Sequence, residues 1–516
     1  MFPSRAALRI RIRIILAGLL FVLICSQSFS RWHKQSDTPE ATSIDGPAAP
    51  RQAQVTWRHA TEGHIEFWRQ FQPLLTTYEP KCLPPLRLGM APSIRFEQAD
   101  PYDQTEFLDL LPMDIKDLQQ THRGFLNAIK TTPPQLNYTR NTRGLVSTAG
   151  GSYLPVLVLS LRMLRRTGSQ LPVEVFLASE DEYETYICDV VLPSLNAQCI
   201  VLSTILSAIP HSIHIEKYQF KLFAMLFSSF EEILFLDADA FALFPPETLF
   251  TRDPFLSYGL ITWPDFWAST ISPSYYEITG QPAPKPPTRP SSESGEVLLS
   301  KRSHLRTLLL STYYNIHGPE FYYPLLSQGA AGEGDKETFV AAATALAEPH
   351  YQVAEPLCAI GHTTQRGGFA GSAMVQFDPT EDFARHRHRE EETHKLQPQA
   401  HGFFLSPPNT TRTAPRIPRA FFIHANYPKF DPATVFDAHE VNPAIGDDGR
   451  YTRAWTGPPE IIRAFGRDVE KEFWEEIRWT ACELEGRFRA WEGKKGVCKR
   501  VEKYYRAMYG GRWWGW

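Results

Sequence analysis

The sequence predicts an α/β fold built around a mixed, mostly parallel sheet. A strand, a helix and a second strand follow one another between residues 144 and 177, and an apolar helix then leads into another strand at 233–236. A helical crossover between two strands of one sheet places those strands parallel. The chain has 516 residues, 43% of them hydrophobic and 21% charged, which is ordinary usage for a globular protein with a large core.

The N-terminus predicts a membrane anchor. Arginines at positions 5, 9, 11 and 13 precede an apolar run from residue 14 to 25, and the arginines favour a cytosolic N-terminus. We therefore expect a cytosolic tail (1–13), a single transmembrane signal-anchor (14–30) and a polar, Pro- and Ala-rich stem (31–56). The apolar run is short, so a cleaved secretory signal peptide is the alternative. Both interpretations place the rest of the chain in the secretory lumen.

The lumenal part is expected to contain an N-terminal region that is mostly helical (57–140), a catalytic domain (141–440) and a C-terminal helical extension (441–516). Excluding Cys25 in the anchor leaves six of the seven cysteines for an oxidising compartment. We predict at least one disulfide, with Cys482 and Cys498 favoured because they are close in sequence. A net charge of −4 gives no general attraction for nucleic acid, so we exclude nucleic acid as a partner.

The β-α-β unit begins with GLVSTAGG, residues 144–151. Leucines and valines then recur at helical spacing from 154 to 164, two arginines and a glycine end the helix, and LPVEVFL (171–177) forms the next strand. A third strand is expected near 199–202. Small residues at the end of the first strand allow close approach of a ligand to the backbone, although packing alone is a competing reason for them.

The stretch ILFLDADAF, residues 233–241, places two carboxylates after an apolar strand. Asp-x-Asp alone is weak, since it is expected about once by chance in a chain of this length. Here the pair follows a strand of an α/β sheet, where ligands bind, and residues i and i+2 of an extended end point to the same side. Asp237 and Asp239 are therefore candidate ligands for Mg²⁺ or Mn²⁺. The competing interpretation is a solvated acidic turn.

Two other patterns suggest different functions. In phosphatases of the haloacid dehalogenase type, Asp-x-Asp also follows an apolar strand. Their pattern has Thr or Val two residues after the second Asp, where this chain has Phe241. A His-rich segment near 381–401 is capable of binding metal, yet its many charges favour a solvated surface loop. Its histidines are His386, His388, His394 and His401.

Six segments in a fixed order resemble the fungal α-1,3-mannosyltransferase family of type II Golgi enzymes. They lie between about residues 140 and 435 and are RGLVSTAGGSYLPVLVLSLRMLRRTGSQLPVEVF, YQFKLFAMLFSSFEEILFLDADAFAL, WPDFW, SESGEVLLSK, SQGAAGEGDKETF and HANYPKFDP. The resemblance implies a GT-A-like fold, GDP-mannose as donor, a mannosylated glycan as acceptor, Mn²⁺ as cofactor and retention of the α configuration. It implies a Golgi membrane enzyme with a lumenal catalytic domain.

The resemblance also assigns roles by residue. Asp237 and Asp239 become metal ligands together with His424, for which a buried structural histidine is the alternative. Residues Glu333, Asp335 and Lys336 become catalytic candidates, although an acidic turn that caps the next helix is an alternative. The donor-binding candidates are Thr148, Ala149, Gly150, Gly151, Lys221, Asp237, Trp263, Asp265, Glu293, Ser294, Gly295, Gln328 and Lys429.

Two rival functions remain open from the sequence. The first is a transferase of the same fold that uses a different nucleotide sugar. The second is a lumenal binding protein that retains the fold without catalysis. The acceptor class, the division of roles among the catalytic candidates and the choice between a covalent adduct and same-face attack are left undecided.

Overall fold

The computed structural model describes residues 51–97, 105–284, 289–395, 417–437 and 441–510. The expected tail, anchor and most of the stem lie outside these ranges. No helix in the described ranges is both long and apolar enough to cross a membrane. Residues Trp57–Trp516 form one compact unit and Met1–Thr56 form another. The description below concerns the first of these.

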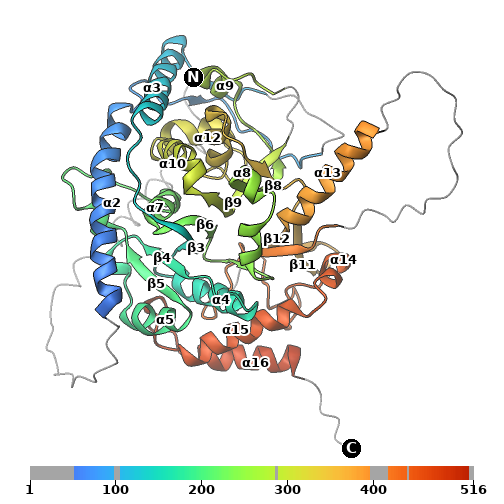
Figure 1. Ribbon diagram of the computed structural model, residues 1–516. Helices are drawn as coiled ribbons and strands as arrows, with labels where there is room; N and C mark the ends of the chain where they lie inside the picture. The colour runs from blue at the N-terminus through green and yellow to red at the C-terminus, as the bar shows by residue number, and fades with distance from the viewer. Residues whose placement is uncertain (1–50, 98–104, 285–288, 396–416, 438–440, 511–516) are drawn as a thin grey trace, which may run out of the picture. The chain divides into compact units, whose positions relative to one another are not determined.

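A seven-stranded sheet organises the unit, in the order β10-β8-β9-β6-β3-β4-β5 (Figure 1). Only β9 runs antiparallel to its neighbours, so the expected α/β fold with a mixed, mostly parallel sheet is confirmed. The strands are β3 (Thr139–Thr148), β4 (Val173–Leu177), β5 (Ala197–Val201), β6 (Phe230–Leu236), β8 (Leu260–Ala268), β9 (Pro290–Ser300) and β10 (Tyr351–Gln352).

Both faces of this sheet are covered, which explains the unbroken apolar run in β6. Ile233 and Phe235 face one core cluster, while Leu234 and Leu236 face the other. Successive side chains of a strand point to opposite faces, so a doubly covered strand must be apolar throughout. On one face lie α7 (Gln219–Phe227), α10 (Lys301–Ile316) and α12 (Thr338–Leu346), and on the other lies α4 (Tyr153–Arg166).

A second, four-stranded antiparallel sheet has the order β11-β12-β13-β7. The chain passes from β6 into this sheet through only three residues, 237–239, before β7 begins. The strands of this sheet are β7 (Ala240–Ala242), β11 (Cys358–Thr363), β12 (Phe369–Phe377) and β13 (Ala420–His424). The acidic pair therefore lies at the junction between the two sheets.

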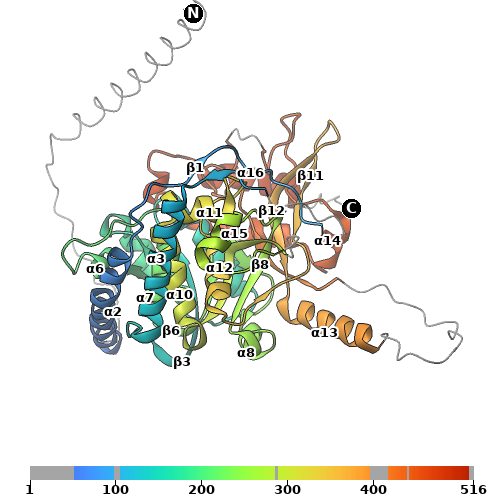
Figure 2. The same ribbon diagram turned by 90° about the horizontal axis from the view of Figure 1, so that it is seen from above.

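Of the two N-terminal helices, α3 (Pro112–Thr131) packs against α10, and α2 (Arg51–Thr77) packs its aromatic side chains against α7 (Figure 2). The Phe125 ring of α3 stacks on Tyr313 of α10 with centroids 4.3 Å apart. A small antiparallel pair, β1 (Leu86–Arg87) and β2 (Leu108–Asp109), lies between these helices in the sequence.

At the other end of the chain, α14 (Pro459–Ala464), α15 (Val469–Glu483) and α16 (Val497–Tyr509) complete the core that covers α4. Disulfides join Cys482 to Cys498 and Cys188 to Cys199, so the disulfide prediction and its favoured pair are confirmed. Shorter helices connect the strands. They are α5 (Leu192–Ser194), α6 (Ser203–Leu206), α8 (Phe255–Tyr258), α9 (Pro273–Thr279) and α11 (Tyr323–Ser327), with the 3₁₀ and π turns η1 (Glu180–Glu182), η2 (Ile187–Val191), η3 (Pro246–Thr251), η4 (Gly318–Tyr322) and η5 (Arg489–Trp491).

The His-rich segment differs from the expectation of a surface loop. Residues Pro379–Lys395 form a helix, α13, and His401 lies outside the described residues. Asp378 accepts a hydrogen bond from the Thr380 amide at 2.8 Å, and Glu381 and Asp382 occupy the first turn, where acidic groups favour helix formation. The segment 379–395 has no glycine and no proline after its first residue, so nothing in it interrupts the helix.

Candidate active site

The acidic pair is held in place by backbone hydrogen bonds from both sheets. The Asp237 amide donates to the Gly295 carbonyl at 2.8 Å, which continues the pairing of β6 with β9. The Asp239 carbonyl accepts from the Ala425 amide at 2.9 Å, which continues the pairing of β7 with β13. Each carboxylate is thus anchored to a different sheet, and the two are fixed relative to one another.

His424 reaches the acidic pair because β13 lies beside β7 with His424 opposite Ala240. Ligand atoms of Asp237, Asp239 and His424 all lie within 4.8 Å of one another. The Nε2 atom of His424 is 3.2 Å from Oδ1 of Asp239. The strand pairing therefore brings together three residues that are separated by up to 187 positions.

Two positively charged side chains, His424 and Lys429, lie beside the Asp239 carboxylate. Burial is the largest single influence and would raise its pKa, but His424 and then Lys429 together hold the pKa of Asp239 well below its usual range. Burial opposes protonation of His424, yet Asp239 and the nearby Glu296 and Glu293 raise its pKa to about 10. The Lys429 ammonium contacts the other oxygen of Asp239. Asp239 therefore stays ionised, with positive charge on both sides.

A second polar group lies beside Asp237, around the buried Lys221 of α7. Its Nζ lies 3.3 Å from Oδ1 of Asp237 and 3.0 Å from Oδ2 of Asp335, and it donates to the Ser294 carbonyl at 2.7 Å. Burial works against the charge of Lys221, but Asp237, Asp335 and Glu293 raise its pKa above the ordinary value. The Ser294 hydroxyl also donates to Asp335 at 3.1 Å. A lysine is thus fixed between the acidic pair and one catalytic candidate.

The other two catalytic candidates lie differently. Lys336 donates to Oδ2 of Asp265 at 2.6 Å and to the Ala331 carbonyl at 2.8 Å. Glu333 pairs with Arg87 of β1 and accepts from the Gly329 amide at 2.6 Å. Among the three, Asp335 alone contacts a residue, Lys221, that also contacts the acidic pair. Its pKa is raised, chiefly by burial.

Gln328 and Trp263 are buried and committed to the fold. Gln328 has a left-handed backbone with φ of 49°, and its side-chain amide hydrogen-bonds three backbone groups, of residues 105, 107 and 270. The Trp263 indole donates to the Phe377 carbonyl at 2.9 Å and is fully buried. Both side chains are therefore held by hydrogen bonds to the backbone of the fold.

The small residues at the end of β3 form a separate edge of the same region. Thr148 is the last residue of β3, and the Ala149 amide donates to the Phe176 carbonyl at 3.1 Å. A Cβ at Gly150 would lie 2.3 Å from the Glu182 carboxyl group, and Gly151 has φ of 50°. The left-handed backbone favours glycine at position 151, and a side chain at position 150 would displace the Glu182 carboxyl group.

Glycine is also required at position 295, directly beside the metal-ligand candidate. A Cβ there would lie 2.6 Å from the His424 ring. The carboxylate of Glu293 accepts from the Gly295 amide at 2.8 Å and lies 3.8 Å from Nδ1 of His424. The SESG segment thus shapes the space around the imidazole ring.

Sequence reasoning missed Glu296. It is fully buried within β9, and neither carboxylate oxygen has a hydrogen-bond partner among the described residues. Burial raises its pKa to about 8, partly offset by the His424 charge. An acidic residue interrupting the apolar run of GEVLLS was the available signal.

The donor set fits a hard divalent cation. Two carboxylates and an imidazole with an unpartnered, buried Nδ1 are ligand types that Mn²⁺ accepts, and their atoms already converge. In the structure, His424 and Lys429 supply the positive charge next to Asp239. Bound metal would replace part of that charge.

Comparison with known proteins agrees with this geometry. A family model described as "Mannosyltransferase putative" matches residues 142–290 and 285–378. The α-1,2-mannosyltransferase MNN21 of Candida albicans is 34% identical over 454 residues, spanning 78% of this chain and 67% of that protein. The α-1,2-mannosyltransferases MNN2 and MNN5 of Saccharomyces cerevisiae are 33% and 32% identical, over 73% and 71% of this chain and 70% and 72% of theirs.

Solved structures were also compared. A galactosyltransferase, LgtC, in complex with donor and acceptor sugar analogs, is 13% identical over 41% of this chain and 73% of that one, with a TM-score of 0.28. This likeness is too slight to assign a fold.

The matches define the class, an enzyme that transfers a hexose. Within that class, the chain belongs to the mannosyltransferase family that includes MNN2 and MNN5 of Saccharomyces cerevisiae. The α-1,3 linkage expected from the sequence gains no support, because these relatives are named α-1,2-mannosyltransferases.

Proposed function

We propose that the protein transfers mannose from GDP-mannose to a mannose-containing glycan and forms an α-1,2 linkage with retention, on a GT-A-like fold. The observation that carries the proposal is the convergence of Asp237, Asp239 and His424 at the end of β6 in a chain of this family. The linkage follows the names of the relatives. Retention follows because the sugar is α-linked in both donor and product.

Asp237, Asp239 and His424 are the residues that would hold Mn²⁺. A bound divalent cation would neutralise negative charge on the diphosphate of the donor. Lys429 contributes a positive charge beside Asp239, and Lys221 contributes one beside Asp237. Because these positive side chains are already in position, they can stabilise the departing diphosphate without a rearrangement of the protein.

Asp335 is the carboxylate that we assign to the reacting sugar. Lys221 orients it from one side and the Ser294 hydroxyl from the other. Lys336 is held by Asp265 and shapes the adjoining wall, together with Glu293 and Gly295. Glu333 is assigned to holding the loop against Arg87. The partly exposed segment 148–151 is assigned to the nucleotide.

We also propose that the enzyme is a type II Golgi membrane protein with its catalytic domain in the lumen. The arginines and apolar run at the N-terminus support this topology. The two disulfides are consistent with an oxidising compartment.

The test is to incubate the purified full chain with Mn²⁺, an α-linked mannobiose and a panel of nucleotide sugars. Transfer from GDP-mannose, with a product cleaved by an α-1,2-specific mannosidase, is the expected result. Transfer from another donor alone would favour the rival transferase. Donor binding with no transfer to any mannoside would favour a non-catalytic binding protein.

A further inference from the structure

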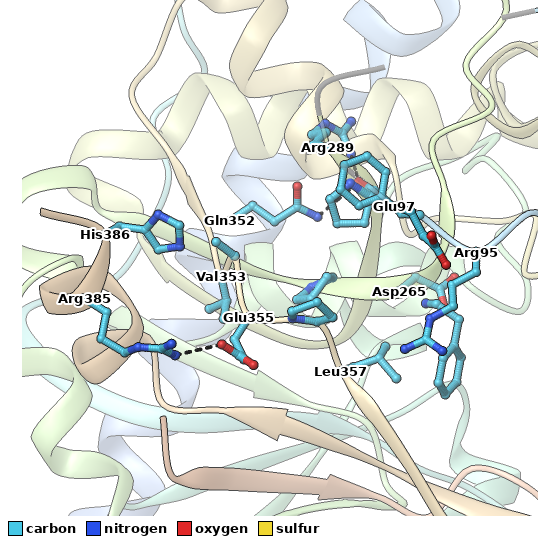
Figure 3. A pocket seen from close by; sticks show the side chains of 16 residues that line it. Arg95, Glu97, Asp265, Arg289, Gln352, Val353, Glu355, Leu357, Arg385 and His386 are labelled. Carbon is cyan, nitrogen blue, oxygen red and sulfur yellow. Dashed lines mark hydrogen bonds and ion pairs between the residues drawn. The ribbon is translucent and has the colours of Figure 1, made fainter. Parts of the chain in front are cut away.

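A cavity of about 600 Å³ lies beside the site but contains none of the metal-ligand candidates. Its walls come from the end of β8, the start of β9, β10 and the residues after it, α13 and the segment around Phe96. Figure 3 shows Asp265, Arg95 and Glu97 on one side of it and Arg385 and His386 on the other. Ligand sites typically have volumes of about 300–1,000 Å³, so the cavity is large enough for a small oligosaccharide.

Sheet topology places the cavity near the acidic pair. β6, β9 and β8 are consecutive neighbours, and β6 and β8 both end at the same edge because each is antiparallel to β9. Leu236, the last residue of β6, lies opposite Glu296 of β9, whereas Ala268, the last residue of β8, lies opposite Pro290, so β8 continues past the end of β6. Asp265 lies on this extension of β8 and lines the cavity.

Contacts between side chains connect the two places directly. Asp265 forms part of the cavity wall and pairs with Lys336 at 2.6 Å. Asp335, the residue before Lys336, contacts Lys221, and Lys221 in turn contacts Asp237. The loop that carries the catalytic candidates is therefore the partition between the acidic pair and the cavity.

The charged groups of the cavity are balanced and held in place. Arg385 pairs with Glu355 at 2.8 Å, and Arg289 pairs with Glu337 at 2.6 Å. With Asp265 bound to Lys336, these pairs leave no excess of positive charge for a phosphate group. Fixed charged groups are well suited to hydrogen bonding with hydroxyl groups instead.

The remaining lining suits a sugar. The Phe96 amide donates to the Phe266 carbonyl at 3.4 Å, so two aromatic residues lie on neighbouring backbone segments of the wall. Aromatic rings provide an apolar surface for the C–H face of a pyranose.

We propose that this cavity is the acceptor subsite and that it binds a neutral, α-linked mannose oligosaccharide. The assignment rests on the proposed function for the reaction that joins acceptor to donor. Phe96 and Phe266 contact the sugar rings, and the exposed Glu97 carboxylate accepts hydrogen bonds from hydroxyl groups. The diphosphate of the donor remains on the other side of the 333–336 loop.

The experiment compares the full-chain enzyme with Phe96→Ala and Glu97→Gln, using Met113→Ala on the distant helix α3 as a matched control. Met113 is 70% exposed and lies outside the cavity. We expect each cavity variant to raise the KM for α-mannobiose at least tenfold, with the KM for GDP-mannose and the melting temperature unchanged. Met113→Ala should leave both KM values unchanged.

A second measurement separates this proposal from the proposed function. Binding of α-mannotriose to the wild type and the variants is followed by saturation-transfer NMR without donor. If the wild type transfers no mannose, the proposed function fails, while sugar binding that is lost in Phe96→Ala would still support the subsite. An unchanged KM for acceptor together with unchanged mannotriose binding in both variants would overturn the subsite, as would an increase confined to the KM for GDP-mannose.

Discussion

Gly295 shows how one missing side chain sets the position of a functional group. Any Cβ there would overlap the His424 ring, which is buried and has no room to move away. We expect Gly295→Ala to weaken Mn²⁺ binding at least tenfold, measured by electron paramagnetic resonance of free Mn²⁺. Gly371→Ala on β12 is the matched control, since its nearest neighbour would be 3.4 Å away. Equal Mn²⁺ affinity in the two variants would contradict the assignment of His424.

Asp239 has a different role, because its charge lies between two cations. We expect Asp239→Asn to reduce transfer at least 100-fold and to lower the pKa of His424 from about 10. Asn keeps the shape and removes the charge, so it is a sharper test than Ala, which also leaves a space next to a buried imidazole. The pKa is measured by NMR of the imidazole protons in the metal-free protein. Full activity in this variant would show that the carboxylate is not a metal ligand.

At the scale of elements, the disulfide between Cys482 and Cys498 ties α15 to α16. Its cysteines are 16 positions apart, and closing a loop of that length stabilises a folded chain by about 3 kcal/mol in the chain-entropy model. We expect the double variant Cys482→Ser and Cys498→Ser to lose up to that amount of unfolding free energy, measured in urea. Transfer activity at low temperature should remain, because neither helix carries a site candidate. Loss of activity without loss of stability would contradict this.

Some helices and strands could be predicted from the sequence, and others could not. Local periodicity identified the helix at 154–164 and the strands at 171–177 and 233–236, since each depends on neighbours within the element. The pairing of β7 with β13 was beyond local patterns, because it joins residues more than 180 positions apart. Asp237 and Asp239 were recognisable from their strand, whereas His424 came only from a family resemblance. The cavity around Phe96 gave no signal, because its walls come from five separate segments.

For the whole molecule, three buried histidines link stability to pH. His64 of α2 packs on Phe227 of α7, His122 of α3 bonds Tyr314 of α10, and His317 after α10 bonds the Leu75 carbonyl of α2. Burial, the largest influence, lowers the pKa of each from 6.5 to about 4. The unfolded chain binds protons below pH 6.5 that the folded chain does not bind until about pH 4. Stability is therefore full above pH 6.5 and falls as the pH drops from 6.5 to 4, by about 3 kcal/mol for each histidine at most.

We expect the urea midpoint to fall between pH 7.5 and pH 5, and to fall less in His122→Gln. An amide can replace the hydrogen bond between His122 and the Tyr314 hydroxyl, which is 2.8 Å long. His386→Gln on α13 is the control, because His386 is half-exposed. The same pH dependence in wild type and His122→Gln would exclude this histidine as a source.

The three-residue strand β7 has a consequence for how the enzyme is made. During synthesis the acidic pair emerges early, but its imidazole partner and the strand that fixes β7 emerge only after residue 420. A ribosome-bound or truncated chain therefore carries the acids without a finished binding centre. Under the proposed metal assignment, a chain that ends before β13 would lack both the imidazole ligand and the strand that pairs with β7.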